Sequence, residues 1–202
     1  MKPRLVVRQK ITAFVNKYTL FQANEDGTVG ALVGLAQQKR LAMKEKVMFY
    51  TDEKRDRLAF TFRAEKVLDV HGRYFVEDAN GNSIGAFKKE FVQSLVSSTW
   101  KIFDATGNEL AVVKESNQWL AVLRRFGGEL PVIGMFVELA MMFLKYHFVF
   151  VEPASGRVMA TYKKTTLFRD HYLLQADDEF WGRVDWRVLA AMSVALDALQ
   201  SR

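Results

Sequence analysis

The sequence predicts a mainly β (α+β) domain, in which antiparallel hairpins close into a barrel around a buried hydrophobic helix at the C-terminus. Two observations favour this fold. Short runs of alternating apolar and polar residues, broken by turn residues, fill most of the chain from residue 4 to about residue 115. The last part of the chain is instead a helical run that is apolar on nearly every side, so it has to be enclosed.

The strand nearest the ideal pattern is Arg57-Leu-Ala-Phe-Thr-Phe-Arg-Ala-Glu65. Leu58, Phe60, Phe62 and Ala64 alternate with Ala59, Thr61, Arg63 and Glu65, which predicts one core face and one wet face. Earlier strands are predicted over Leu5 to Ile11, Tyr18 to Ala23, Val29 to Leu35 and Val47 to Thr51, with a hairpin turn at Glu25-Asp26-Gly27.

A hairpin motif then repeats. Tyr74-Phe-Val-Glu-Asp78-Ala-Asn-Gly81-Asn returns 26 residues later as Trp100-Lys-Ile-Phe-Asp104-Ala-Thr-Gly107-Asn. In each copy we expect the Asp to accept backbone hydrogen bonds inside the turn and the Gly to supply a positive φ. A looser third copy runs from Phe148 through Glu152 and Gly156, with Val158 to Tyr162 as its return strand. A meander of this length can close into a barrel.

Between the second and third copies the pattern is helical. Trp119 to Arg125 and Leu130 to Leu144 are the predicted helices, separated by Gly127-Gly128. Pro131, Glu138 and the flanking polar residues interrupt the apolar run, so we expect packing against one end of the barrel and no transmembrane span. After the third copy, Thr165 to Phe168 is predicted to pair with His171 to Ala176.

The C-terminal run from Val184 to Gln200 is predicted to be one long helix that forms the hydrophobic core. Its core side chains are predicted to be Trp186, Leu189, Met192, Leu196 and Leu199. The uninterrupted apolar part, Val188 to Leu196, is too short to span a bilayer. The acidic residues Asp177-Asp178-Glu179 precede this helix, where the helix dipole favours them, and a bound cation is the weaker interpretation.

Composition limits the class of protein. With 202 residues, half of them hydrophobic, the chain is predicted to form a single domain over residues 1–202. It has no Cys and no apparent signal peptide, so we expect a cytoplasmic protein. The net charge of +6 leaves room for an anionic partner, although basic residues also serve solubility.

No catalytic constellation stands out, so an enzyme is not expected. His71, His147 and His171 are far apart and show no metal-ligand spacing, and no nucleophile elbow or phosphate-binding loop is present. We therefore expect no metal and no cofactor. Aromatic residues fall at core-facing alternations without interleaved basic residues, which makes nucleic acid an unexpected partner.

Several of these segments together resemble the LURP-one-related family, which belongs with phospholipid scramblases and the tubby C-terminal domain. They are Ala64-Glu-Lys-Val-Leu-Asp69, the hairpin Tyr74 to Phe87, the Trp100 hairpin, and Asp170-His-Tyr172 through Asp185-Trp-Arg-Val-Leu-Ala to Arg202. The resemblance implies a closed, mostly antiparallel barrel of about twelve strands around a hydrophobic C-terminal helix. The chain lacks the Cys cluster, the Pro-rich segment and the calcium loop of scramblases, which argues against scrambling.

The resemblance and the positive charge together predict a non-catalytic binding module for anionic phospholipid or phosphoinositide, peripheral at a membrane surface. The candidate ligand-binding residues are the basic pairs Lys88-Lys89, Arg124-Arg125 and Lys163-Lys164, each expected at or beside a loop. The alternative is a protein-interaction or structural scaffold without a lipid ligand. A small apolar ligand inside the barrel is disfavoured, because the helix should fill that space.

Overall fold

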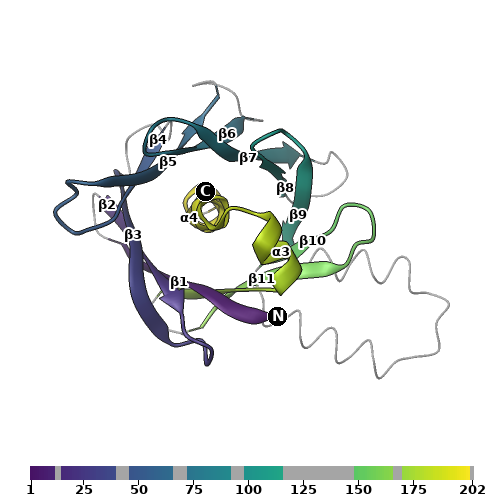
Figure 1. The fold of residues 1–202 in the computed structure, drawn as a ribbon, viewed down its shortest axis with the longest axis horizontal. Coiled ribbons are helices and arrows are strands. Elements are labelled where there is room, and N and C mark those ends of the chain that lie inside the picture. Colours follow the sequence, from purple (N-terminus) through teal and green to yellow (C-terminus); the bar gives the residue numbers. More distant parts are fainter. Residues whose placement is uncertain are drawn as a thin grey trace.

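The computed structural model describes residues 1–11, 15–39, 46–65, 72–91, 98–115, 148–165 and 170–200. Within these ranges twelve strands form one closed antiparallel barrel around a helix, α4 (Trp186–Gln200) (Figure 1). Each strand pairs with its neighbours in chain order, and the first strand pairs with the last. The predicted fold class, a barrel of hairpins around a C-terminal helix, is confirmed.

The strands are β1 (Lys2–Ile11), β2 (Val15–Ala23), β3 (Val29–Lys39), β4 (Lys46–Tyr50), β5 (Leu58–Ala64), β6 (Arg73–Asp78), β7 (Ser83–Phe91), β8 (Ser98–Asp104), β9 (Glu109–Glu115), β10 (Phe148–Val151), β11 (Val158–Lys164) and β12 (Asp170–Ala176). The strands predicted in the first half of the chain are all present. The helices predicted over Trp119 to Arg125 and Leu130 to Leu144 lie outside the described residues.

The partner predicted for the last strand was wrong. The strand register pairs β12 with β11 on one side and with β1 on the other, and β11 extends to Lys164. Closure of the barrel supplies both partners of β12, so no additional strand is needed after β11. Of the proposed partner strand, residues 166–168 lie outside the described part of the chain.

The repeated hairpins have the predicted turn geometry. One carboxylate oxygen of Asp104 accepts the backbone N–H groups of Thr106 and Asn108, both at 2.9 Å. Gly107 follows with a φ of 93°, which residues with a side chain rarely adopt. The turn at Asp78 repeats this arrangement, so the sequence repeat encodes a turn of defined hydrogen bonding.

Strand β5 shows how the barrel wall separates core from solvent. Phe60 and Phe62 are buried and Arg63 is exposed, as the alternation predicts. Thr61 was expected on the wet face but is only 2% exposed. Its cross-strand neighbours are Met48 and Glu77, whose longer side chains on the same face account for its burial.

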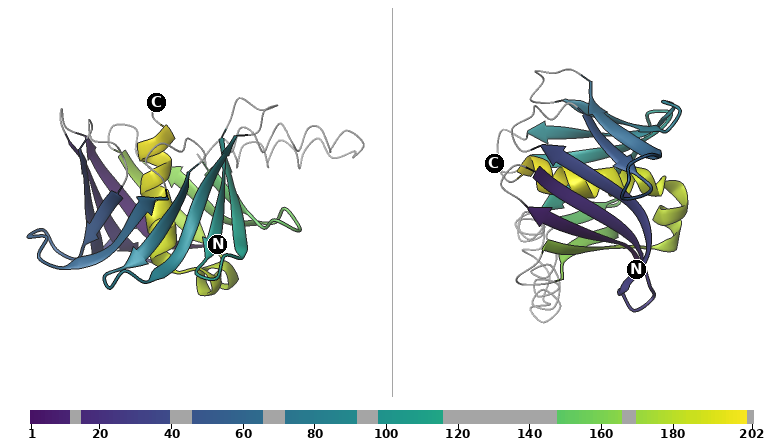
Figure 2. Two further views of the ribbon diagram at one scale, coloured as in Figure 1. Left: turned by 90° about the horizontal axis from the view of Figure 1, so that it is seen from above. Right: turned by 90° about the vertical axis from the view of Figure 1, so that its left-hand side faces the viewer.

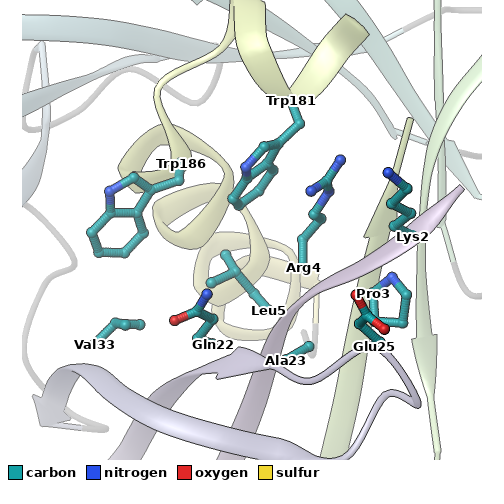
Figure 3. Close-up of a pocket in the computed structure, with 10 residues that line it drawn as sticks. All are labelled: Lys2, Pro3, Arg4, Leu5, Gln22, Ala23, Glu25, Val33, Trp181 and Trp186. Atoms are coloured by element: carbon teal, nitrogen blue, oxygen red, sulfur yellow. The ribbon is translucent and has the colours of Figure 1, made fainter. Parts of the chain in front are cut away.

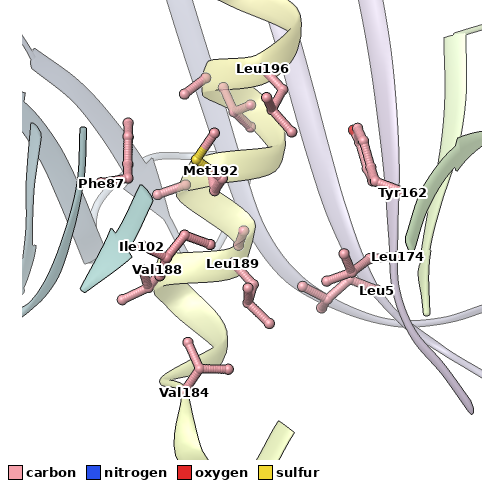
Figure 4. Close-up of a cluster of buried hydrophobic side chains, with 14 of the residues drawn as sticks. Leu5, Phe87, Ile102, Tyr162, Leu174, Val184, Val188, Leu189, Met192 and Leu196 are labelled. Atoms are coloured by element: carbon pink, nitrogen blue, oxygen red, sulfur yellow. The ribbon is translucent and has the colours of Figure 1, made fainter. Parts of the chain in front are cut away.

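Helix α4 fills the interior of the barrel. Every residue from Val188 to Leu196 is at most 1% exposed, including Leu189 and Met192 (Figure 4). The hydroxyl of Ser193 donates to the carbonyl oxygen of Leu189 at 2.8 Å, so the helix carries its one buried hydroxyl group in this stretch without a loss of hydrogen bonding. The helix runs along the barrel with its C-terminal end at one opening (Figure 2).

The last helix begins two residues later than predicted, and a separate short helix that was not predicted precedes it. A short helix, α3 (Asp178–Arg183), ends before Val184, and α4 begins only at Trp186. The carboxylate of Asp185 accepts the backbone N–H of Arg187 at 2.9 Å, so Asp185 precedes the new helix as a capping residue. Asp177 likewise accepts the N–H of Phe180 at 2.7 Å and caps α3.

The predicted core residues of the helix are not equivalent. Leu189, Met192 and Leu196 are buried, whereas Trp186 is only partly buried and packs against the edge of the core cluster. Trp186 is the first residue of α4 and lies near the barrel opening, which explains its exposure. Leu199 belongs to α4, but its side chain is outside the described part.

Helix α4 approaches the wall closely at Gly85 of β7. A Cβ atom at this position would lie 2.7 Å from Cγ2 of Val188 and 2.8 Å from the carbonyl oxygen of Phe103, and φ is 156°.

We expect Gly85→Ala to lower the free energy of unfolding by about 2 kcal/mol or more, measured by chemical denaturation. Gly182→Ala is the control, because a Cβ there meets nothing within 4 Å. It should leave stability unchanged or slightly raised, and equal losses at both positions would contradict the close packing.

Because α4 is buried, truncating one of its core side chains should destabilise the protein. Leu189→Ala should destabilise the protein by about 2–5 kcal/mol, since it leaves a cavity in a packed core. Leu32→Ala is the matched control, because Leu32 is 40% exposed, and should change stability by less than about 0.5 kcal/mol. Thermal or urea unfolding monitored by circular dichroism measures both. A small effect at Leu189 would show that α4 does not form the core.

The hairpin turns predict a pH dependence. Hydrogen bonds from the side chains of Thr106 and then Asn108 lower the pKa of Asp104 from 3.8 to about 2. Because this pKa is lower in the folded state, its contribution to stability is present above the unfolded pKa and is lost as pH falls through the folded pKa. Asp104→Ala should therefore destabilise the protein at pH 7, with the difference shrinking between about pH 4 and pH 2. Urea unfolding across this range tests it, and a difference independent of pH would argue against it.

Candidate functional site

The structure separates the two members of the Lys88-Lys89 pair. Both lie within β7 and not in a loop. Lys89 is on the same strand face as the buried Phe87, and its Nζ lies 5.5 Å from the centre of the Trp100 ring. Desolvation lowers the pKa of the Lys89 ammonium. Lys88 is on the outer face, 3.8 Å from Glu90, so the pair does not form a doubly charged surface.

Lys163 and Lys164 are divided in the same way at the end of β11. Lys164 shares a strand face with Tyr162, which is buried in the barrel, and Lys163 is on the opposite face. Three strands separate β11 from β7 around the barrel, so the structure does not bring the two pairs together. Arg124 and Arg125 lie outside the described residues.

A different set of cations converges on the outside of the barrel. Lys10 of β1 lies directly opposite Lys17 of β2, and both side chains are exposed. Arg55, from the loop between β4 and β5, reaches the same place with a φ of 61°. These three residues, which we call the basic groove, line a hollow of about 340 Å³ together with Tyr18, Thr19, Leu35, Ala36, Gln37 and Glu53.

The basic groove carries unbalanced positive charge. Like charges directly opposite one another on neighbouring strands destabilise a sheet. Within the part of the chain that the structure describes, Lys10, Lys17 and Arg55 make no ion pair, and Glu53 is the one acidic residue lining the hollow. Arg8 extends the basic face along β1, with its guanidinium 5.1 Å from the centre of the Phe21 ring. An anionic group in the groove would relieve this repulsion.

A larger hollow lies at the opening of the barrel where α4 begins. It has a volume of about 780 Å³ and is lined by residues of β1, β2, β3 and the two helices (Figure 3). We call it the mouth pocket: Lys2, Pro3, Arg4, Leu5, Gln22, Ala23, Glu25, Val33, Trp181 and Trp186. Trp181 belongs to α3 and Trp186 to α4, and both are partly buried.

Ion pairs fix α3 beside the mouth pocket. Asp178 binds both Arg4 and Lys2, the latter at 2.8 Å, and these contacts lower the pKa of the Asp178 carboxyl. The guanidinium of Arg4 also lies 5.2 Å from the centre of the Trp181 ring. From the other side, Arg157 contacts Glu179 at 2.9 Å, so α3 is attached both to β1 and to the turn between β10 and β11.

Two classes of feature are absent from the described ranges. No group of three or more His, Asp or Glu residues there is arranged to hold a metal ion. None of the helices in these ranges has the length and apolar character needed to cross a membrane.

Comparison with known proteins gives a family match. The sequence profile of the LURP-one-related family matches residues 34–197, which is most of the chain. This chain belongs to the LURP-one-related family. No curated protein matches it closely enough to transfer a function. No solved structure matches its sequence significantly either.

The LURP-one-related match begins within β3 and includes Arg55, Trp181 and Trp186. Lys10 and Lys17 precede it, as do Lys2 and Arg4. Both hollows therefore combine residues inside the family match with residues of β1 and β2 that lie before it. The structure establishes the fold class, and the family match leaves the ligand to be argued from these sites.

Sequence reasoning missed the basic groove because it looked for basic residues adjacent in sequence. The hairpin formed by β1 and β2 could have shown that Lys10 faces Lys17, since both strands were predicted. Nothing local in the sequence indicates that Arg55 joins them, because this depends on how the loop after β4 bends back over the wall. Trp181 was missed because α3, the short helix that carries it, was not predicted.

Proposed function

We propose that this LURP-one-related domain is a non-catalytic binding module that recognises anionic phospholipid headgroups at a membrane surface through the basic groove. The observation that carries the proposal is the uncompensated Lys10–Lys17 cross-strand pair, with Arg55 beside it around a hollow. Family membership is consistent with lipid binding and does not by itself identify a lipid.

The chemistry of the groove suits a phosphate group. Ammonium and guanidinium groups both donate charge-assisted hydrogen bonds to phosphate oxygens, and a guanidinium can do so with two N–H groups at once. Three cations around one hollow favour a headgroup with more than one phosphate, such as a phosphoinositide, over a single diester. Glu53 also lines the groove, and its negative charge partly offsets the attraction of the three cations for a phosphate.

The position of the groove also suits a membrane surface. Lys10 and Lys17 are exposed on the outer wall, and Arg8 continues the basic face along the same strand. Juxtaposed basic residues are attracted to anionic leaflets, each contributing about 1 kcal/mol near the surface. Because the interior is filled by α4, the ligand has to bind outside the barrel.

Vesicle flotation tests the proposed function. Adding anionic lipid to phosphatidylcholine vesicles should increase the bound fraction, and higher salt should reduce this increase. Lys17→Glu should weaken the anion-dependent binding about fivefold or more. Lys88→Glu makes the same change of charge on β7, at the opposite side of the barrel between Arg73 and Lys101, and should have little effect.

Two outcomes would contradict the proposal. One is equal binding to vesicles with and without anionic lipid, which together with a stoichiometric protein partner in a pull-down would favour a protein-interaction scaffold. The other is an equal loss for Lys17→Glu and Lys88→Glu, which would mean that net charge and not the basic groove attracts the protein.

A further inference from the structure

The mouth pocket holds two indole rings that the core leaves partly exposed. Residues Val188 to Leu196 of α4 are fully buried, but Trp186 at the start of the helix and Trp181 in α3 are not. In Figure 3, Trp181 lies between Trp186 and Arg4. A nearly perpendicular contact with Phe60, 5.8 Å between ring centres, holds the orientation of Trp186.

One side of the pocket offers donors to an anion. Lys2 and Arg4 share a single carboxylate, Asp178, so two positive charges face one negative charge. The Nε atom of Arg4 is buried and has no hydrogen-bond partner. That nitrogen has no surface open to a ligand, but the side chain of Arg4 is 17% exposed and that of Lys2 is 66% exposed. Their remaining N–H groups can donate to the oxygens of a phosphate in the pocket.

The pocket as a whole is neutral. Glu25 lines it together with Lys2 and Arg4, and with Asp178 the acidic and basic charges balance. A ligand with only negative charge would meet Glu25, and one with only positive charge would meet Lys2 and Arg4. A zwitterion matches both features when its phosphate lies at Arg4 and its cation lies at the indoles.

Indole rings favour a particular cation. A quaternary ammonium has no N–H group to donate, is weakly hydrated, and is attracted to the faces of Trp rings, which is how aromatic cages bind choline. Trp181 and Trp186 come from two helices and border one hollow, with the apolar side chain of Val33 beside them (Figure 3). The volume of about 780 Å³ lies within the range of small-molecule pockets.

We propose that the mouth pocket binds a phosphocholine group, with the phosphate at Arg4 and Lys2 and the trimethylammonium at Trp181 and Trp186. The group can come from a choline phospholipid or from free phosphocholine. This goes beyond the proposed function, because it uses different residues from the basic groove and a ligand that carries a quaternary ammonium beside its phosphate. Loss of binding at one site leaves the other intact.

Isothermal titration of the whole protein with phosphocholine tests the pocket. We expect binding of phosphocholine at least about tenfold tighter than of choline or of glycerol phosphate, because each of these offers only one of the two charged groups. Trp186→Leu and Arg4→Gln should each weaken it about tenfold. Arg73→Gln is the matched control, since Arg73 also stacks on an aromatic ring, also has a buried Nε without a partner, and lines neither the mouth pocket nor the basic groove.

A measurement on the wild-type protein keeps the test independent of how the variants fold. In an NMR spectrum the indole N–H signals of Trp181 and Trp186 should shift on addition of phosphocholine, whereas that of the buried Trp100 should not. Single Trp→Phe variants assign the signals. A concentration of about 10 mM phosphocholine is high enough to reveal even weak binding. If neither signal shifts at this concentration, the proposal is overturned.

Two further comparisons test which group of the ligand each side chain contacts. Binding of glycerol phosphate as tight as that of phosphocholine would overturn the assignment of the indoles to the ammonium. An equal loss for Arg4→Gln and Arg73→Gln would overturn the assignment of Arg4 to the phosphate. Tighter binding of dihexanoyl-phosphatidylcholine below its micelle concentration indicates the lipid as the source, and equal binding indicates the free headgroup.

Discussion

The burial of α4 inside the barrel is the constraint on which the rest of the structure depends. A helix that is apolar on all sides is stable only if the wall covers all of it, and twelve strands in one closed sheet achieve this. The wall then has to approach the helix closely, as it does at Gly85. Because the interior is packed, ligands are excluded from it, and both hollows lie at the surface or at the opening.

The alternation of side chains along a strand decides which basic residues can act together. Neighbouring residues in a strand point to opposite faces, so Lys88 and Lys89 are separated by the wall itself. Residues directly opposite on adjacent strands share a face, and this brings Lys10 beside Lys17. In a barrel, a cationic surface is therefore built across strands and not along the chain.

The short helix α3 links the core to the mouth pocket. Phe180 is buried and packs into the core, while Trp181, the next residue, lines the pocket. Ion pairs from Asp178 to β1 and from Arg157 to Glu179 hold the helix from two sides. The position of α3 therefore places the two indoles and Arg4 around one hollow.

The sequence by itself determined the hairpins and the buried helix. Turn chemistry is local, as at Asp104 and Gly107, and the apolar run from Val188 to Leu196 requires burial on every side. The tertiary structure alone decided the meeting of Arg55 with Lys10 and of Arg4 with Trp181. These contacts join residues far apart in the chain. They follow from how the closed barrel brings strands and loops together, which no local pattern encodes.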